Sequence, residues 1–112
     1  MRIVDRATFL AMPAGTVYAK FEPMIFGDIA IKGESIGDID FRYSELGNPW
    51  FVGDNGSDTH FTFLEEIQEG AAMVIDYSTD FRDGLFDADQ LFAVWERADV
   101  EALIARLQET LT

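Results

Sequence analysis

Three segments in the first half of the chain alternate apolar and polar residues, and this pattern constrains the fold more than any other feature. The segments are 16–22 (TVYAKFE), 28–32 (DIAIK) and 38–43 (DIDFRY). A period of two residues is typical of β-strands that bury one face. Gly33 follows the second segment and is interpreted as a turn residue. The pattern therefore predicts an antiparallel meander with one polar face.

Helical signals precede and follow this meander. Asp5 is expected to cap a short helix that ends near Met12, before Pro13. Ser57 or Asp58 is expected to cap a second helix through Glu69, which Gly70 closes. The buried side of that helix is predicted to carry Phe61, Leu64 and Ile67.

The last third of the chain predicts two strands and a final helix. The strands are 72–77 (AMVIDY) and 91–96 (LFAVWE). Asp99 is expected to cap the final helix, in which apolar residues recur at helical spacing at Val100, Leu103, Ile104, Leu107 and Leu111.

Size and composition indicate one domain spanning residues 1–112. The chain has 112 residues, of which 48% are hydrophobic and 13% aromatic, enough to fill one core. The predicted fold class is two-layer α+β. It has a mainly antiparallel sheet of about five strands, two or three helices, and the C-terminal helix packed on the sheet.

Charge excludes several classes of partner. The chain carries 21 acidic and 8 basic residues, a formal net charge of −13. Such a chain lacks the basic footprint that binds a nucleic-acid backbone and is repelled by acidic membrane surfaces. It associates faster with cationic surfaces. The expected partner is a basic protein or nucleoprotein complex, with no direct binding of nucleic acid or membrane.

The chain contains no Cys, so disulfides, thiolate nucleophiles and Cys-ligated zinc are excluded. The first six residues, MRIVDR, lack an apolar stretch, and no apolar run approaches the length of a membrane span. The expected location is the cytoplasm of a bacterial host.

Sets of catalytic residues and cofactor motifs are not recognisable. The lone histidine, His60, is interpreted as a surface or capping residue, and no serine lies in a G-x-S-x-G context. Glycine-rich phosphate loops are lacking. The acids between Asp76 and Asp89 invite comparison with a calcium loop, but Phe81 stands where a ligand would be needed before Gly84. In the other candidate loop, before Gly56, Gly53 stands in the ligand position. We therefore expect no enzyme activity, no cofactor and no metal site.

The segment from Asp76 to Glu101 is the candidate binding surface. It has eight acids and two arginines, a formal charge of −6, with aromatic residues interleaved. Interfaces commonly combine aromatic anchors with a charged rim. The alternative interpretation is a solvent-exposed hairpin whose acids provide solubility and whose aromatic side chains point into the core. The predicted partner-binding residues are Asp76, Asp80, Asp83, Asp87, Asp89 and Glu96.

Two stretches, 3–16 (IVDRATFLAMPAGT) and 91–101 (LFAVWERADVE), are similar to small uncharacterised acidic proteins encoded by bacteriophages and prophages. The resemblance implies a phage accessory protein, a group in which anti-CRISPR and other counter-defence inhibitors are frequent. It carries over no site residues.

The sequence-based hypothesis is thus a non-enzymatic acidic inhibitor, anti-CRISPR-like, that docks on a basic nucleic-acid-binding partner and mimics nucleic acid. The alternatives are an immunity protein or antitoxin against a basic toxin, a metal-dependent enzyme, and a structural or assembly subunit of a virion.

Overall fold

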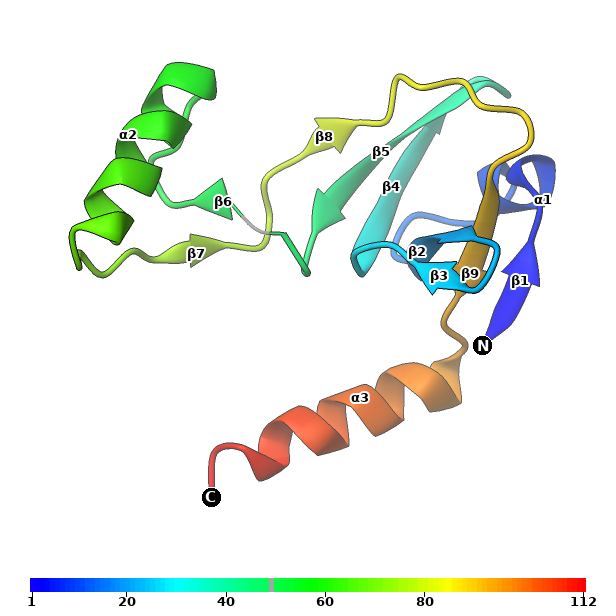
Figure 1. The fold of residues 1–112 in the computed structure, drawn as a ribbon. Coiled ribbons are helices and arrows are strands. Elements are labelled where there is room, and N and C mark those ends of the chain that lie inside the picture. Colours follow the sequence, from blue (N-terminus) through cyan, green and yellow to red (C-terminus); the bar gives the residue numbers. More distant parts are fainter. Residues whose placement is uncertain (49) are drawn as a thin grey trace.

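A computed structural model describes residues 1–48 and 50–112. Within these residues the chain forms three helices and nine strands (Figure 1). The helices are α1 (Arg6–Leu10), α2 (Ser57–Gln68) and α3 (Arg97–Glu109). The strands are β1 (Arg2–Val4), β2 (Val17–Glu22), β3 (Ile25–Phe26), β4 (Ala30–Ile36), β5 (Asp40–Glu45), β6 (Trp50–Phe51), β7 (Ile75–Asp76), β8 (Phe81–Arg82) and β9 (Leu91–Val94).

The main sheet has seven strands in the described residues, in the order β1-β9-β2-β4-β5-β8, with β3 paired to β2. Every pairing is antiparallel. The α+β class and the mainly antiparallel sheet are therefore confirmed. Strands β1, β3 and β8 were not predicted, because two or three residues are too few to show alternation.

An aromatic cluster fills the core between α1 and one face of the sheet. Phe9 of α1 stacks on Phe92 of β9 with ring centroids 4.1 Å apart. Tyr18 of β2 and Phe41 of β5 surround Phe9 at 4.7 and 5.0 Å. The predicted cap of α1 is confirmed, because the Asp5 side chain accepts a hydrogen bond from the Thr8 N–H at 2.8 Å.

Gly33 does not form a turn as predicted. Strand β4 continues through it, and its pairing with β5 shifts register between Lys32 and Ser35. A Cβ at Gly33 would lie 3.2 Å from the Arg42 Cβ, so glycine allows a close approach inside a bulge. The turn follows at Gly37, whose φ of 62° suits glycine.

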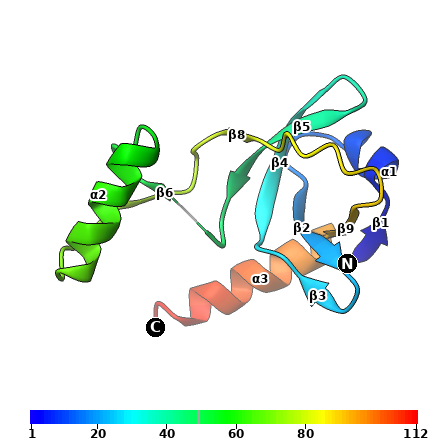
Figure 2. The ribbon, with the colours of Figure 1, turned by 45° about the horizontal axis from the view of Figure 1, so that its top comes forward.

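Helix α3 does not lie across the sheet as expected. Asp99, Val100 and Leu103 are half-buried, and none of its described side chains is fully buried. Both ribbon views show the helix leaving the sheet near the N-terminus (Figures 1 and 2). Phe26 of β3 contacts Phe21 and Trp95, with ring centroids 5.2 and 6.5 Å apart.

The N-terminal cap of α3 is Glu96 and not Asp99. Asp99 instead lies in the first turn, and its carboxylate accepts a hydrogen bond from the Glu96 N–H at 2.9 Å. The N-terminal amine also contacts Asp99. The contact with the amine holds the start of α3 close to the N-terminus, beside β1.

Residues 50–77, here called the α2 lobe, stand apart from the main sheet (Figures 1 and 2). The lobe consists of β6, α2 and β7, with β6 paired to β7. The predicted helix is confirmed at its C-terminal end, since α2 ends at Gln68 and Gly70 has a φ of 99°. Its N-cap is Gly56 and not Ser57 or Asp58 as predicted. Of the predicted strand 72–77, only Ile75–Asp76 is extended.

Candidate interaction surfaces

The predicted partner-binding residues do not form one surface. Asp76 is half-buried in β7, within the α2 lobe. Asp80 is exposed and pairs with Arg42 of β5, with Oδ2 to Nε at 2.6 Å. Asp87 and Asp89 are exposed on the loop between β8 and β9. Glu96 is exposed at the start of α3, where its Oε1 lies 3.5 Å from the Arg2 Nε.

Asp83 is the clearest correction among them, because its side chain is only 2% exposed. Its carboxylate accepts from the Lys20 Nζ at 2.6 Å and from the Arg6 guanidinium at 3.3 Å. Asp83 therefore joins β2, α1 and the loop after β8 inside the protein and cannot face a partner. The position of Asp83 in an acidic segment does not indicate that it is buried, because its partners Arg6 and Lys20 come from distant parts of the chain.

Asp40 is a second buried carboxylate that sequence reasoning left as a strand residue. It pairs with Arg82 of β8 and accepts from the backbone N–H groups of Gly84 and Phe41, at 3.0 and 2.9 Å. Burial opposes its ionisation, but these donors outweigh burial and hold the pKa of Asp40 at about 2. Arg82 is thus engaged by the protein itself.

Most of the Lys and Arg side chains of the chain form ion pairs with acids. Within the described residues, the basic side chains that pair with acids are Arg2, Arg6, Lys20, Arg42, Arg82, Arg97 and Arg106. Lys32 is buried and donates to Ser35 and to the Gly33 carbonyl, at 2.8 and 3.1 Å. Burial lowers the pKa of Lys32.

The α2 lobe differs, because residues 50–77 contain six acids and no Lys or Arg, a formal charge of −6. Glu65, Glu66 and Glu69 are exposed along the last turn and C-cap of α2. In the described part of the chain, no ion pair links the acids of the lobe to a Lys or Arg. The lobe therefore carries negative charge that the rest of the chain leaves uncompensated.

The lobe also exposes apolar side chains among these acids. Phe61 of α2 is 64% exposed and Val74 is 70% exposed. Val52, Leu64, Ile75 and Tyr77 are exposed as well. Exposed aromatic and aliphatic groups within a charged surround are typical of interaction surfaces.

Of the predicted buried side of α2, only Ile67 is half-buried, whereas Phe61 and Leu64 are exposed. The other half-buried positions of the helix are Thr59, His60 and Phe63. His60 sets the phase of α2: its ring stacks on Trp50 at 4.7 Å and its Nδ1 lies 2.6 Å from Asp54 Oδ2. Phe63 contacts Phe51 at 5.9 Å.

The pair His60 and Asp54 has the geometry in which a carboxylate orients an imidazole. Asp54 is the buried partner, with a side chain 0% exposed. In the described residues, the neighbours of the ring are the aromatic faces of Trp50 and Phe51, and no hydroxyl hydrogen-bonds to it. The pair thus holds β6 against α2, a structural role.

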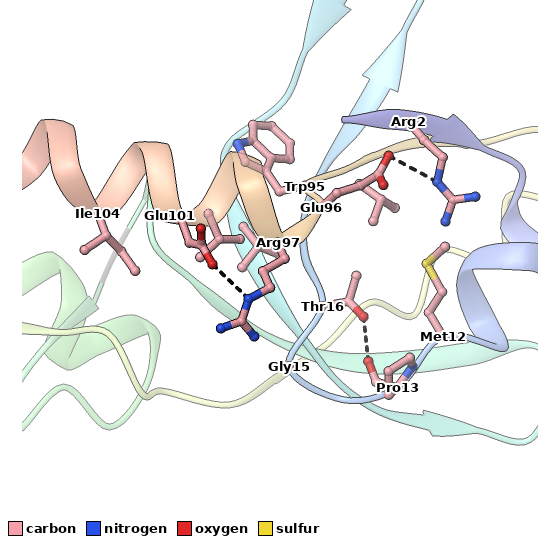
Figure 3. A pocket seen from close by; sticks show the side chains of 13 residues that line it. Arg2, Met12, Pro13, Gly15, Thr16, Trp95, Glu96, Arg97, Glu101 and Ile104 are labelled. Carbon is pink, nitrogen blue, oxygen red and sulfur yellow. Dashed lines mark hydrogen bonds and ion pairs between the residues drawn. The ribbon is translucent and has the colours of Figure 1, made fainter.

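A groove of about 590 Å³ lies between the start of α3 and the edge of the sheet (Figure 3). Met12, Trp95 and Ile104 supply apolar surface. Charged groups at the groove pair with one another: Arg97 Nε lies 2.8 Å from Glu101, and Arg2 Nε lies 3.5 Å from Glu96. The groove therefore offers an apolar floor with few free charges.

No group of three or more His, Cys, Asp or Glu side chains in the described residues is arranged to hold a metal ion. No helix in the same residues combines the length and apolar character needed to cross a bilayer.

Comparison with known proteins gives no relative: no family model, no curated protein and no solved structure matches the chain. The structure describes an antiparallel α+β fold with an acidic α2 lobe.

Proposed function

We propose that the chain is a non-enzymatic binding protein that uses its α2 lobe to dock on a basic protein. The observation that carries the proposal is the uncompensated formal charge of −6 on residues 50–77, next to exposed Phe61 and Val74. An apolar centre with a negative surround complements a groove that is apolar inside and rimmed by Lys or Arg.

The wider hypothesis from the sequence extends this proposal. A basic groove that normally holds nucleic acid is one surface of the required chemistry, and the phage-like stretches 3–16 and 91–101 suggest an inhibitor of the anti-CRISPR kind in a bacterial cytoplasm. The lobe replaces the segment 76–101 as the docking surface, because Asp83 is buried and Asp80 is paired with Arg42.

The test is affinity capture from bacterial lysate with two variants of equal charge change. The lobe variant is E65K/E66K/E69K, which places lysines at the end of α2, where positive charge favours the helix. The control variant is D38K/D87K/D89K, in which all three acids are exposed on the main body.

We expect a basic nucleic-acid-binding protein to be captured at low salt by the wild type and the control, released at high salt, and lost from the lobe variant. Equal loss from both triple variants would show that net charge alone drives capture. Equal retention would remove the lobe from the interface.

A further inference from the structure

A second feature that could receive a positive group is a small pocket on the core face of the sheet, at the end of β5. Its volume is about 200 Å³, below the range of roughly 300–1,000 Å³ usual for sites of drug-sized ligands. Its lining includes Tyr18, Tyr43, Asp28 and Glu45, together with Lys20. The pocket is thus of side-chain size.

Two glycines allow the backbone to close around the pocket. The Gly27 N–H donates to the Lys20 carbonyl at 2.7 Å, and a Cβ at Gly27 would lie 3.3 Å from that oxygen. A Cβ at Gly47 would lie 3.1 Å from the Asp28 Cβ. Close backbone approach therefore holds Asp28 and Lys20 at the rim of the pocket.

The carboxyl group of Glu45 lacks a full set of donors. Its Oε2 is buried and has no hydrogen-bond partner among the described residues. Burial, and then the charge of Asp28, raise the pKa of Glu45. Buried polar atoms without partners are uncommon in folded proteins and call for an explanation.

Lys20 does not satisfy this need. Its Nζ lies 2.6 Å from Asp83 Oδ1, so the nearest ammonium is held by a different carboxylate. The pocket therefore keeps two acidic residues, Asp28 and Glu45, beside two tyrosines.

We propose that this pocket receives the guanidinium group of an arginine side chain on the partner. A guanidinium donates to carboxylates in a planar fork and stacks on aromatic faces, which matches Glu45, Asp28 and the half-buried Tyr43. The two carboxyl groups repel an anion, and no described group of three acidic or His side chains holds a metal ion.

The pocket also lies near the α2 lobe along the chain. Glu45 precedes Trp50 by five residues, which span at most about 18 Å. One partner can therefore contact both regions. This inference rests on the proposed function only for the source of the arginine, since binding of the guanidinium group can be measured alone.

The experiment is an NMR titration of the protein with N-acetyl-L-arginine amide, with N-acetyl-L-glutamine amide as the neutral reference. We expect saturable shifts of the Gly27 and Gly47 amides and of the Tyr18 and Tyr43 ring signals with the arginine probe only. Binding should lower the pKa of Glu45, followed by its side-chain carboxyl shift, because a bound cation favours the ionised form.

Glu45→Gln and Asp28→Asn should each weaken probe binding about tenfold, because each removes one charge-assisted contact. Asp38→Asn, at an exposed turn residue, should leave probe binding unchanged. Circular dichroism of each variant verifies that the fold is retained. The proposal would be refuted if no shifts appear up to the solubility limit of the probe. Shifts of equal size in E45Q and the wild type would refute it as well.

The two proposals fail separately. A chain that binds the arginine probe but captures no basic protein would refute the docking function and leave the pocket standing. A chain that captures its partner through the lobe but gives no saturable shift would refute the pocket alone.

Discussion

The main body of the protein, residues 1–48 and 78–96, and the α2 lobe are built on different principles. The body buries an aromatic cluster around Phe9 and pairs most of its cations with acids. In the lobe, no described apolar residue is fully buried, and residues 50–77 contain no Lys or Arg. Regions with few buried contacts open most easily, and binding segments are often drawn from them. We therefore expect the body to carry most of the stability, and the proposed docking uses the less tightly packed lobe.

The largest effect should come from emptying the core of the body. Phe92→Ala removes a fully buried ring that stacks on Phe9, and should lower the free energy of unfolding by about 3–5 kcal/mol. Phe63→Ala, the matched change in the lobe, removes a half-buried ring and should cost about 1 kcal/mol. Urea denaturation of both variants measures the difference. Equal losses would mean that lobe and body unfold as one equally packed unit.

Asp40 should be the most sensitive polar position of the body. Asp40→Ala leaves the N–H groups of Gly84 and Phe41 without their acceptor and removes the partner of Arg82. The expected loss is about 2–3 kcal/mol in the same denaturation assay. Asp58→Ala, at an exposed acid of the lobe, should change stability by less than about 0.5 kcal/mol. A loss at Asp40 no larger than at Asp58 would contradict the buried pair.

Acidic pH should lower the stability of the body through Asp40. The pKa of Asp40 is about 2 in the folded protein against 3.8 for the free group, so the unfolded chain binds the proton first as pH falls. The stability that Asp40 contributes is therefore present above about pH 4 and is lost between about pH 4 and pH 2.

Unfolding of the wild type and Asp40→Asn, compared at several pH values, isolates this contribution from the other acids. The difference in free energy of unfolding between the two proteins should be largest above pH 4 and should decrease toward zero near pH 2. A difference that is independent of pH would show that the Asp40 carboxylate is not the titrating group.

The sequence predicted much of the body because its strands follow the alternation of period two. Segments 16–22, 38–43 and 91–96 all overlap strands of the sheet. It could not show that Asp83 is buried, because the two cations that neutralise it, Arg6 and Lys20, are distant in sequence. The segment was therefore interpreted as a charged surface. Whether an acidic side chain such as Asp83 is buried depends on which cations the fold places beside it.

The lobe was harder to predict for a related reason. The phase of α2 depends on His60, which contacts Trp50 and Asp54, and no helical periodicity contains that information. The missing signal was compositional: residues 50–77 have no Lys or Arg, which a count over that segment alone would have revealed. The small pocket beside Glu45 brings together β2, β5 and the turn before β4, and needs the three-dimensional structure.

Within the lobe, Trp50 should control local opening more than global stability. Its ring contacts His60 at 4.7 Å and Phe81 of the body at 5.1 Å, so it links the two regions. Trp50→Ala should accelerate hydrogen exchange of the α2 amides about tenfold while the amides of β2 and β9 keep their rates. Exchange that accelerates equally in β9 would show that the lobe and the body open together.

The smallest effect is expected on α3, where the sequence predicted a buried apolar stripe. Leu107 is 57% exposed, and the helix projects from the sheet. Leu107→Ser should therefore change the free energy of unfolding by less than about 0.5 kcal/mol, close to the difference in helix propensity. Val100→Ser is the matched change at a half-buried position of the same helix, beside the groove of Figure 3, and should cost more. A loss of about 2 kcal/mol or more at Leu107 would mean that α3 buries its apolar face in solution, against the sheet or another chain, and the helix would then belong with the body in carrying stability.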